Sequence, residues 1–300
     1  MFDPIVPTLD CAGRILRLDR PRIAGIVNVT PDSFSDGGRF LETAQAIEHG
    51  LRLVEQGADL LDVGGESTRP GAEPVPAEVE IARVVPVIEA LVRQTSVPVS
   101  VDTSKPEVMR AAVAAGAGLI NDVYALRQPG VLETAVQLGV PVCLMHMQGE
   151  PRHMQAAPHY DDVVGEVKRF LAERVLACEF AGMPRQRLLV DPGFGFGKTL
   201  EHNLALLRGL GTFATLGLPV LAGLSRKAMI GTLTGRESPA ERAVGSAAAA
   251  LIAVQRGVAI VRVHDVAATR DALAIWQAVA VGETPARARR AARSPFDDED

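Results

Sequence analysis

Polar side chains that could bind a ligand stand where short apolar runs of the sequence end. Asp102, Asn121 and Asp191 offer hydrogen-bond acceptors of the kind that a flat, donor-bearing heterocycle requires. Nearer the end of the chain, equivalent positions carry positive charge suited to an anion, namely Lys227, Arg262 and His264. Together these residue types predict a site for a heterocycle that carries phosphate.

The parity of these residues places them on one face of the strands that would carry them. Side chains of a strand alternate between its two faces, so residues two apart share a face. The residues that share the face expected to point into the site are Asn28, Ser100, Asp102, Asn121, Met145, Asp191, Gly223, Ser225, Arg262 and His264. Polar groups that converge on one pocket cost several kcal/mol unless a polar ligand pairs with them. His146 is out of step with Met145, which favours a hydrogen-bonded histidine behind the sheet.

Two segments rich in turn-forming residues follow the first two apolar runs. Residues 28–38 include Phe34 and Asp36, and residues 64–71 include Thr68 and Arg69. A plain connector needs neither aromatic nor charged side chains of this kind, so a mobile lid over the site is predicted, with a simple connector as the alternative.

A glycine-rich segment at residues 193–199 looks like a phosphate-binding P-loop, but its spacing is wrong by one residue. The first glycine of that motif would fall on Pro192. We interpret the segment as a loop that carries Phe196 as a stacking platform, with Lys198 exposed to solvent rather than catalytic. The sequence carries no nucleophile elbow, Ser–His–Asp signature or zinc-ligand spacing, so covalent catalysis is not indicated.

The elements that must position these residues repeat eight times. Each apolar run is followed by an amphipathic stretch, and Gly or Pro marks most junctions, as in β/α units around a parallel sheet. The expected strands are 23–29, 60–65, 98–102, 119–124, 140–147, 188–191, 220–225 and 260–264, and the expected helices are 43–57, 77–94, 106–116, 131–139, 162–182, 200–213, 239–257 and 268–280. Eight units favour a single α/β (β/α)8 TIM barrel over an open doubly wound sheet. Its active site would lie at the carboxyl ends of the strands.

The chain divides into three parts. Residues 1–22 are predicted to form an N-terminal, hairpin-like extension that caps the barrel, residues 23–282 the barrel itself, and residues 283–300 a charged, disordered tail. The net charge of -5 and the lack of a dense basic cluster before that tail argue against nucleic-acid or membrane partners. Three cysteines without metal-ligand spacing, and no leader or long apolar run, favour a cytoplasmic protein.

Six segments together resemble the dihydropteroate synthases, a family of pterin-binding barrel enzymes of folate biosynthesis. They are residues 25–38, 62–71, 120–123, 191–198, 225–227 and 262–265. The resemblance implies a transferase that condenses 6-hydroxymethyl-7,8-dihydropterin diphosphate with 4-aminobenzoate, releasing pyrophosphate and giving 7,8-dihydropteroate. It also implies sulfonamides as inhibitors, Mg²⁺ as cofactor and a homodimer.

By the same resemblance, each motif position acquires an expected role. Catalytic roles fall to Asp102, Lys227, Arg262 and His264. Pterin ligands would be Asp102, Asn121, Asp191 and Lys227, with Met145, Phe196 and Gly223 beside them. Diphosphate would be held by Arg69, Arg262 and His264, with Mg²⁺ on Asn28, while Phe34, Thr68 and Pro70 would bound the aminobenzoate and Asp36 would complete the lid. Ala228 departs from relatives that carry serine there, which predicts a modest effect on aminobenzoate affinity.

The expected reaction is a dissociative displacement in which pyrophosphate binds before aminobenzoate. A neutral arylamine is already nucleophilic, so no strong general base is required, while Asp102 would stabilise a cationic pterin fragment. Two alternatives remain open from sequence: a methyltransferase that uses a folate but no diphosphate, and a catalytically silent pterin-binding paralogue. The small-residue stretch 243–250 fits either tight packing within the barrel or a dimer interface.

Overall fold

Eight parallel strands form the barrel in a computed structural model that describes residues 7–29, 39–68, 71–150, 153–280 and 282. The strands are β3 (Arg22–Asn28), β4 (Leu60–Gly64), β5 (Val99–Asp102), β6 (Leu119–Asp122), β7 (Val142–Met145), β8 (Leu188–Asp191), β9 (Leu221–Ala222) and β10 (Ile260–Val263). Their order is β8-β7-β6-β5-β4-β3-β10-β9, and a parallel bridge between Val190 and Val220 brings the two ends together. The predicted eight-stranded barrel is confirmed.

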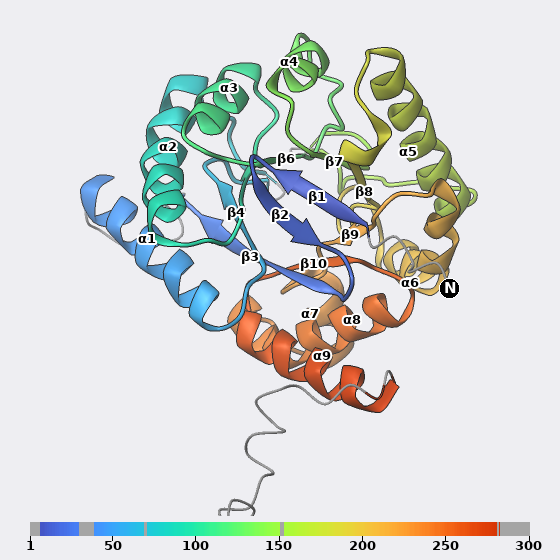
Figure 1. Ribbon diagram of the computed structural model, residues 1–300. Helices are drawn as coiled ribbons and strands as arrows, with labels where there is room; N and C mark the ends of the chain where they lie inside the picture. The colour runs from blue at the N-terminus through green and yellow to red at the C-terminus, as the bar shows by residue number, and fades with distance from the viewer. Residues whose placement is uncertain (1–6, 30–38, 69–70, 151–152, 281, 283–300) are drawn as a thin grey trace, which may run out of the picture.

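Helices surround the strands on the outside (Figure 1). They are α1 (Arg39–Glu55), α2 (Ala77–Gln94), α3 (Pro106–Ala114), α4 (Val131–Leu138), α5 (Val163–Phe180), α6 (Leu200–Gly209), α7 (Ala228–Thr234), α8 (Ala243–Gln255) and α9 (Val266–Ala280). The short helix α7 was not predicted. Strand β9 is also shorter than the expected run 220–225, because the chain leaves the sheet after Ala222.

An antiparallel hairpin of β1 (Thr8–Cys11) and β2 (Arg14–Arg17) crosses the middle of the ring in Figure 1. Its apolar side chains Leu9, Cys11 and Leu16 are buried in one cluster with inward residues of seven strands. Gly118 lets the hairpin approach, since a Cβ there would lie 2.4 Å from the Cys11 carbonyl oxygen. The expected hairpin therefore closes the end of the barrel opposite the carboxyl ends of the strands.

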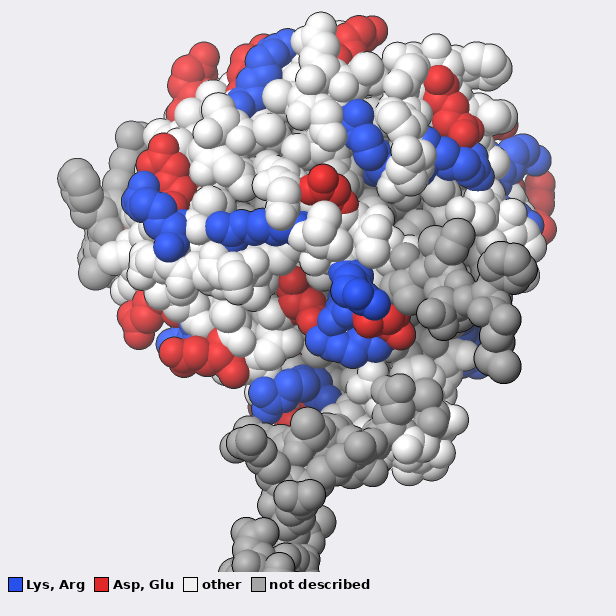
Figure 2. Space-filling model, in the orientation of Figure 1, with Lys and Arg blue, Asp and Glu red and all other residues white. Residues whose placement is uncertain are grey.

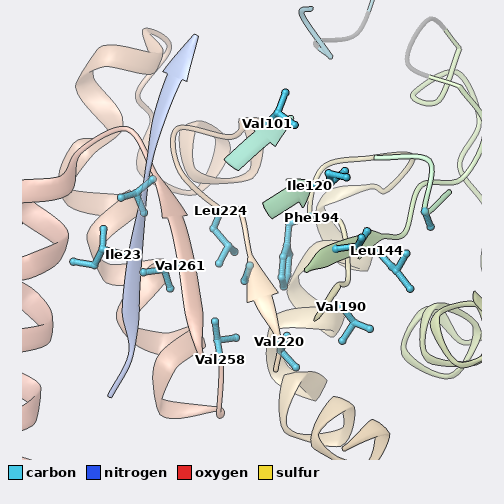
Figure 3. Close-up of a cluster of buried hydrophobic side chains, with 14 of the residues drawn as sticks. Ile23, Val101, Ile120, Leu144, Val190, Phe194, Val220, Leu224, Val258 and Val261 are labelled. Carbon is cyan, nitrogen blue, oxygen red and sulfur yellow. The ribbon is translucent and has the colours of Figure 1, made fainter. Parts of the chain in front are cut away.

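A second apolar layer lies between the strands and the helices. Ile23, Val101, Ile120 and Leu144 belong to it, together with Phe194 from the loop after β8 (Figure 3). These strand residues alternate with the inward ones, so the pleat separates the barrel interior from the helix layer. Full burial of one such side chain stabilises the fold by about 1.5–3 kcal/mol. The whole layer therefore gives a rigid frame for the residues at the carboxyl ends of the strands.

Charge on the hairpin face is mixed, with acidic and basic side chains interspersed (Figure 2). Asp59, for example, pairs with Arg20 at 2.5 Å and with Arg22 at 3.1 Å. Among the described helices, none has the length and apolar character needed to cross a membrane. The three cysteines are buried free thiols, as expected for small apolar residues. The proposed tail 283–300 lies outside the described residues.

Candidate active site

A row of aligned residues crosses four neighbouring strands at the carboxyl end of the barrel. The strand register pairs Asn28 with Gly64, Gly64 with Asp102, and Asp102 with Asn121. A Cβ on Gly64 would lie 3.9 Å from Asp102 Oδ2 and 4.0 Å from Asn28 Oδ1. The glycine thus leaves an open space between two side-chain oxygens, and the structure brings these predicted site residues together.

Arg262 lies among the acceptors instead of standing apart as a cation for an anion. Its Nε donates to Asp62 Oδ2 at 2.5 Å, and its Nη2 donates to Asp102 Oδ2 at 2.7 Å. Asp62 is buried and also accepts hydrogen bonds from Ser100 Oγ at 2.5 Å and Asn121 Nδ2 at 3.3 Å. Arg262 thus joins the cations of the site to its acceptors, and its expected role as a ligand of the diphosphate stays a prediction.

Asp62 is a site residue that the strand ends do not reveal, although parity does. It lies two residues after Leu60 and two before Gly64 in β4, so it shares their inward face. It stands inside the apolar run of β4 and not at its end, where the other polar site residues lie. Its contacts make it the residue that orients the Arg262 guanidinium.

The Asp102 carboxyl has an unusual ionisation. Its pKa is raised to about 7, because burial and the nearby Asp62 charge raise it more than the Arg262 charge lowers it. The pKa of Arg262 itself is raised: burial alone would lower it, but Asp62 and Asp102 outweigh that effect. A carboxylate that titrates near neutrality in a cleft is a mark of a functional site.

Asn121 and Asp191 present further acceptors to the barrel mouth. Asn121 is 5% exposed, and its Oδ1 atom has no hydrogen-bond partner in the described part of the chain. Asp191 Oδ1 accepts the backbone N–H of Gly193 at 2.7 Å, and burial raises the pKa of this carboxyl. A buried acceptor without a partner is costly, so the site is built for a ligand that donates a hydrogen bond.

Lys227 and Phe196 form one wall of the same site. The Lys227 ammonium lies 4.3 Å from the centroid of the Phe196 ring and donates to the Phe194 carbonyl oxygen. Burial lowers the pKa of Lys227 to about 8, partly opposed by the Asp191 charge. Phe196 in turn packs against an apolar cluster that includes Met145 and Met147. The predicted grouping of Met145 with Phe196 is thus found in the structure.

Lys198 is buried, and its predicted exposure to solvent is wrong. Its Nζ lies 2.9 Å from His146 Nδ1 and donates to the Gly193 and Phe196 carbonyl oxygens at 2.8 and 3.0 Å. The glycine loop folds back over this lysine, and only 3% of Lys198 is exposed. His146 makes the hydrogen bond expected of it and packs edge-on against Phe170 of α5, outside the barrel interior. Burial lowers its pKa to about 2.

The loops after β9 and β10 are joined by polar contacts. Ser225 Oγ accepts the backbone N–H of His264 at 3.1 Å and lies 3.0 Å from its ring Nδ1. Arg226, whose φ is +59°, donates two hydrogen bonds to Asp265 at 2.9 and 2.6 Å. These contacts fix the orientation of His264 and the backbone that carries Lys227.

The remaining predicted residues lie near the mouth or outside the described chain. Thr68 and Asp102 line a common cavity of about 430 Å³. A Cβ on Gly223 would be 3.9 Å from Arg262 Cβ, so this glycine leaves room beside the guanidinium. Ala228 is exposed at the first residue of α7. Phe34, Asp36, Arg69 and Pro70 lie outside the described residues.

The site can accept several hydrogen bonds from one edge of a flat ligand. Asp102, Asn121 and Asp191 supply the acceptors, and Met145 and Phe196 supply apolar surface beside them. Such a site suits a ring with several N–H donors.

Comparison with known proteins agrees with this chemistry. Residues 24–264 match the sequence family described as pterin binding enzyme. Dihydropteroate synthase of Escherichia coli strain K12 is 52% identical over 266 residues, which cover 89% of this chain and 94% of that protein. The chain belongs to the pterin-binding enzymes and, within them, to the dihydropteroate synthase family.

Solved structures of relatives share the fold closely. Xanthomonas albilineans dihydropteroate synthase with 4-aminobenzoic acid is 65% identical, with a TM-score of 0.88 and coverage of 93% of this chain and 100% of that one. A structure of the same enzyme with 7,8-dihydropteroate is 62% identical, with a TM-score of 0.84 and the same coverage. Yersinia pestis dihydropteroate synthase with a sulfonamide drug is 49% identical, has a TM-score of 0.87, and covers 91% of this chain and 99% of that one.

Proposed function

We propose that this barrel condenses 6-hydroxymethyl-7,8-dihydropterin diphosphate with 4-aminobenzoate to give 7,8-dihydropteroate and pyrophosphate. The observation that carries the assignment is the buried Asn121 Oδ1, which has no partner among the described residues and lies in the same ring as two acidic acceptors. A pterin edge supplies N–H donors for such a ring of acceptors. The bound ligands of the solved relatives support the same substrates, and a sulfonamide would compete with the aminobenzoate.

The pterin binds with its donor edge on Asp102, Asn121 and Asp191. Its ring lies against Met145 and Phe196, which exclude water from one side. Lys227 donates to an acceptor atom of the ring, since its ammonium already faces this space over Phe196. Binding strengthens these contacts because the site is mostly removed from water.

The residues at the mouth fit Mg²⁺ held mainly by the substrate. Asn28 Oδ1 faces the space above Gly64, and an amide oxygen is a ligand that this hard cation accepts. Within the described ranges, no group of three or more His, Cys, Asp and Glu side chains is arranged to hold a metal ion. An ion held mainly by the substrate, with Asn28 as the protein ligand, would need no such group. Bound there, Mg²⁺ would offset the charge that grows on the leaving pyrophosphate.

The protein's own residues support a dissociative displacement. Asp102, held by Arg262, stabilises the positive charge that develops on the pterin as its C–O bond breaks. His264 contacts the diphosphate from a position fixed by Ser225. The family resemblance assigns Arg262 to the same group, helped by Arg69. The aminobenzoate nitrogen then attacks the pterin carbon from which pyrophosphate has left. The nitrogen loses its proton to solvent, since the product amine is weakly basic. Thr68, Pro70 and Phe34 bound the aminobenzoate, and Asp36 completes the lid.

We also infer that the chain forms a homodimer in the cytoplasm. Val244 on α8, and Ile275 and Val279 on α9, are large exposed apolar residues on two helices that pack together. Large apolar side chains exposed on neighbouring helices favour an interface. Three buried free thiols suit a reducing compartment. Sedimentation should show a dimer for the wild type and a monomer for Ile275→Glu. A monomeric wild type would refute the interface.

Pyrophosphate release tests the proposed reaction. The purified chain should release pyrophosphate and form dihydropteroate only when both substrates and Mg²⁺ are present. A methyltransferase would do neither, and a silent paralogue would bind pterin without turnover. Release of pyrophosphate that does not depend on Mg²⁺ would refute the role given to Asn28.

A further inference from the structure

An ion-pair cluster next to the site is used by none of the steps above. Lys105 Nζ contacts Glu66 and lies 2.5 Å from Glu80 Oε2. Glu66 belongs to the loop after β4, Glu80 to α2, and Lys105 to the loop between β5 and α3. The Glu80 side chain is 1% exposed, and those of Lys105 and Glu66 are 25% and 28% exposed. Three separate elements therefore meet at one ammonium group.

The cluster lies between the two halves of the proposed site. Lys105 follows Asp102 by three residues, and Thr68 follows Glu66 by two. All four residues line the same cavity of about 430 Å³. Since Lys105 holds Glu66, it ties the loop that carries Thr68 to the strand end that carries Asp102.

The first part of the loop is already packed closely on α2. Arg83 Nη1 donates to the Gly65 carbonyl oxygen at 2.8 Å. A Cβ on Gly65 would lie 2.7 Å from Val84 Cγ1 and 3.0 Å from Glu80 Cγ. Beyond Gly65, the contact of Glu66 with Lys105 is the next anchor along the loop.

We propose that Lys105 is a positioning residue that holds the loop after β4 in the conformation that binds 4-aminobenzoate. The proposal rests on the proposed function, because Thr68 is taken to bound that substrate. Lys105 compensates two carboxylates at once: burial alone would lower its pKa, but Glu66 and Glu80 raise it. The other charged residues that line the cavity are all acidic, namely Asp102, Glu107 and Glu150.

Removal of the ammonium should release the loop selectively. Without it, Glu66 would have lost its cation and would face Glu80, whose pKa burial already raises, so the more exposed Glu66 would turn towards solvent. The loop would then lose the anchor that Glu66 supplies, and aminobenzoate binding would have to order it again. Asp102 lies on β5 itself and is held by Arg262, so pterin binding should change little.

Kinetics with each substrate varied in turn will test this role in the full-length protein. Lys105→Met should raise the KM for 4-aminobenzoate about tenfold and change the KM for the pterin diphosphate less than about twofold. Lys105→Arg, which can pair with both carboxylates, should restore the KM to within about threefold of wild type. Glu66→Gln should give an intermediate effect. Arg185→Met breaks a remote ion pair with Glu179 and should leave both KM values unchanged.

Hydrogen exchange of the substrate-free protein separates this proposal from the proposed reaction. A peptide covering residues 60–68 should exchange faster in Lys105→Met and Glu66→Gln than in wild type and Arg185→Met. Unchanged exchange, equal increases in both KM values, or no rescue by arginine would each overturn the positioning role. An inactive wild type that still shows the exchange difference would refute the reaction and leave the loop anchor intact. If Lys105→Met does not fold, Glu66→Gln alone carries the same comparison.

Discussion

Asp62→Asn should move the acid limb of the pH profile to lower pH. The neutral amide removes one of the two carboxylates that share Arg262, so the guanidinium pairs more fully with Asp102. The Asp62 charge also raises the pKa of Asp102 directly. Both effects lower the pKa of Asp102 and favour its ionised form, which is the form that accepts hydrogen bonds from the pterin.

The size of the shift follows from the geometry. Loss of one charge that shares a guanidinium with Asp102 should lower the Asp102 pKa by about one unit, or about 1.4 kcal/mol. With the pKa near 7 in the wild type, about a tenth of Asp102 is ionised at pH 6, and with a pKa near 6 about half would be. We therefore compare kcat/KM for the pterin diphosphate at pH 6 with its plateau value at high pH in the same protein. This ratio should be about fivefold higher in Asp62→Asn than in wild type.

The assay is the profile of kcat/KM from acid to alkaline pH for wild type, Asp62→Asn and a matched control. Asp59→Asn makes the same chemical change at a carboxylate that pairs with Arg20 and Arg22 on the hairpin face. That variant should keep the wild-type limb. In all three proteins activity should rise with pH, because ionised Asp102 is required. A limb that stays in place in Asp62→Asn, or moves to higher pH, would refute the reasoning.

Three further changes have defined expectations. Gly193→Ala should lower the unfolding free energy measured in urea by more than about 3 kcal/mol, because the new Cβ would lie 1.9 Å from the His146 carbonyl oxygen. Gly130→Ala is the control: Gly130 has a similar φ but open space around it, so the loss should be about 1 kcal/mol. Lys198→Met should cost about 3 kcal/mol in the same measurement, since it leaves buried carbonyl groups without a donor; a loss below about 1 kcal/mol would show that the lysine does not hold the glycine loop. Ala228→Ser should lower the KM for 4-aminobenzoate about two- to threefold by adding a hydroxyl donor; an unchanged KM would show that the missing serine is of no consequence.

The strands were predictable because period-two alternation and eight regular units are properties of the sequence. Strand β8 begins and ends at the predicted residues, and the other strands differ by a few residues at most. Helix α7 was missed because it has only seven residues and follows Lys227 directly, with no apolar period to reveal it.

The site was predictable where a residue closes a strand and not where packing decides its environment. Asp102, Asn121 and Asp191 stand at or next to the strand ends, and their inward parity held. The burial of Lys198 depends on a glycine loop with three left-handed residues, Gly193, Gly195 and Gly197, folding over it. The contacts of Arg262 with Asp62 and Asp102 join residues as many as 200 positions apart, which no local pattern reports.

Calorimetry of pterin diphosphate binding to Asn121→Leu tests the central claim most directly. The leucine keeps the branching of the side chain but removes the buried Oδ1 acceptor that has no partner among the described residues, together with the Nδ2 donor to Asp62. If that atom receives a donor of the pterin edge, the Kd should rise about thirtyfold, corresponding to about 2 kcal/mol. A folded variant that binds the pterin diphosphate as tightly as wild type would contradict the assignment of this acceptor ring as the pterin site.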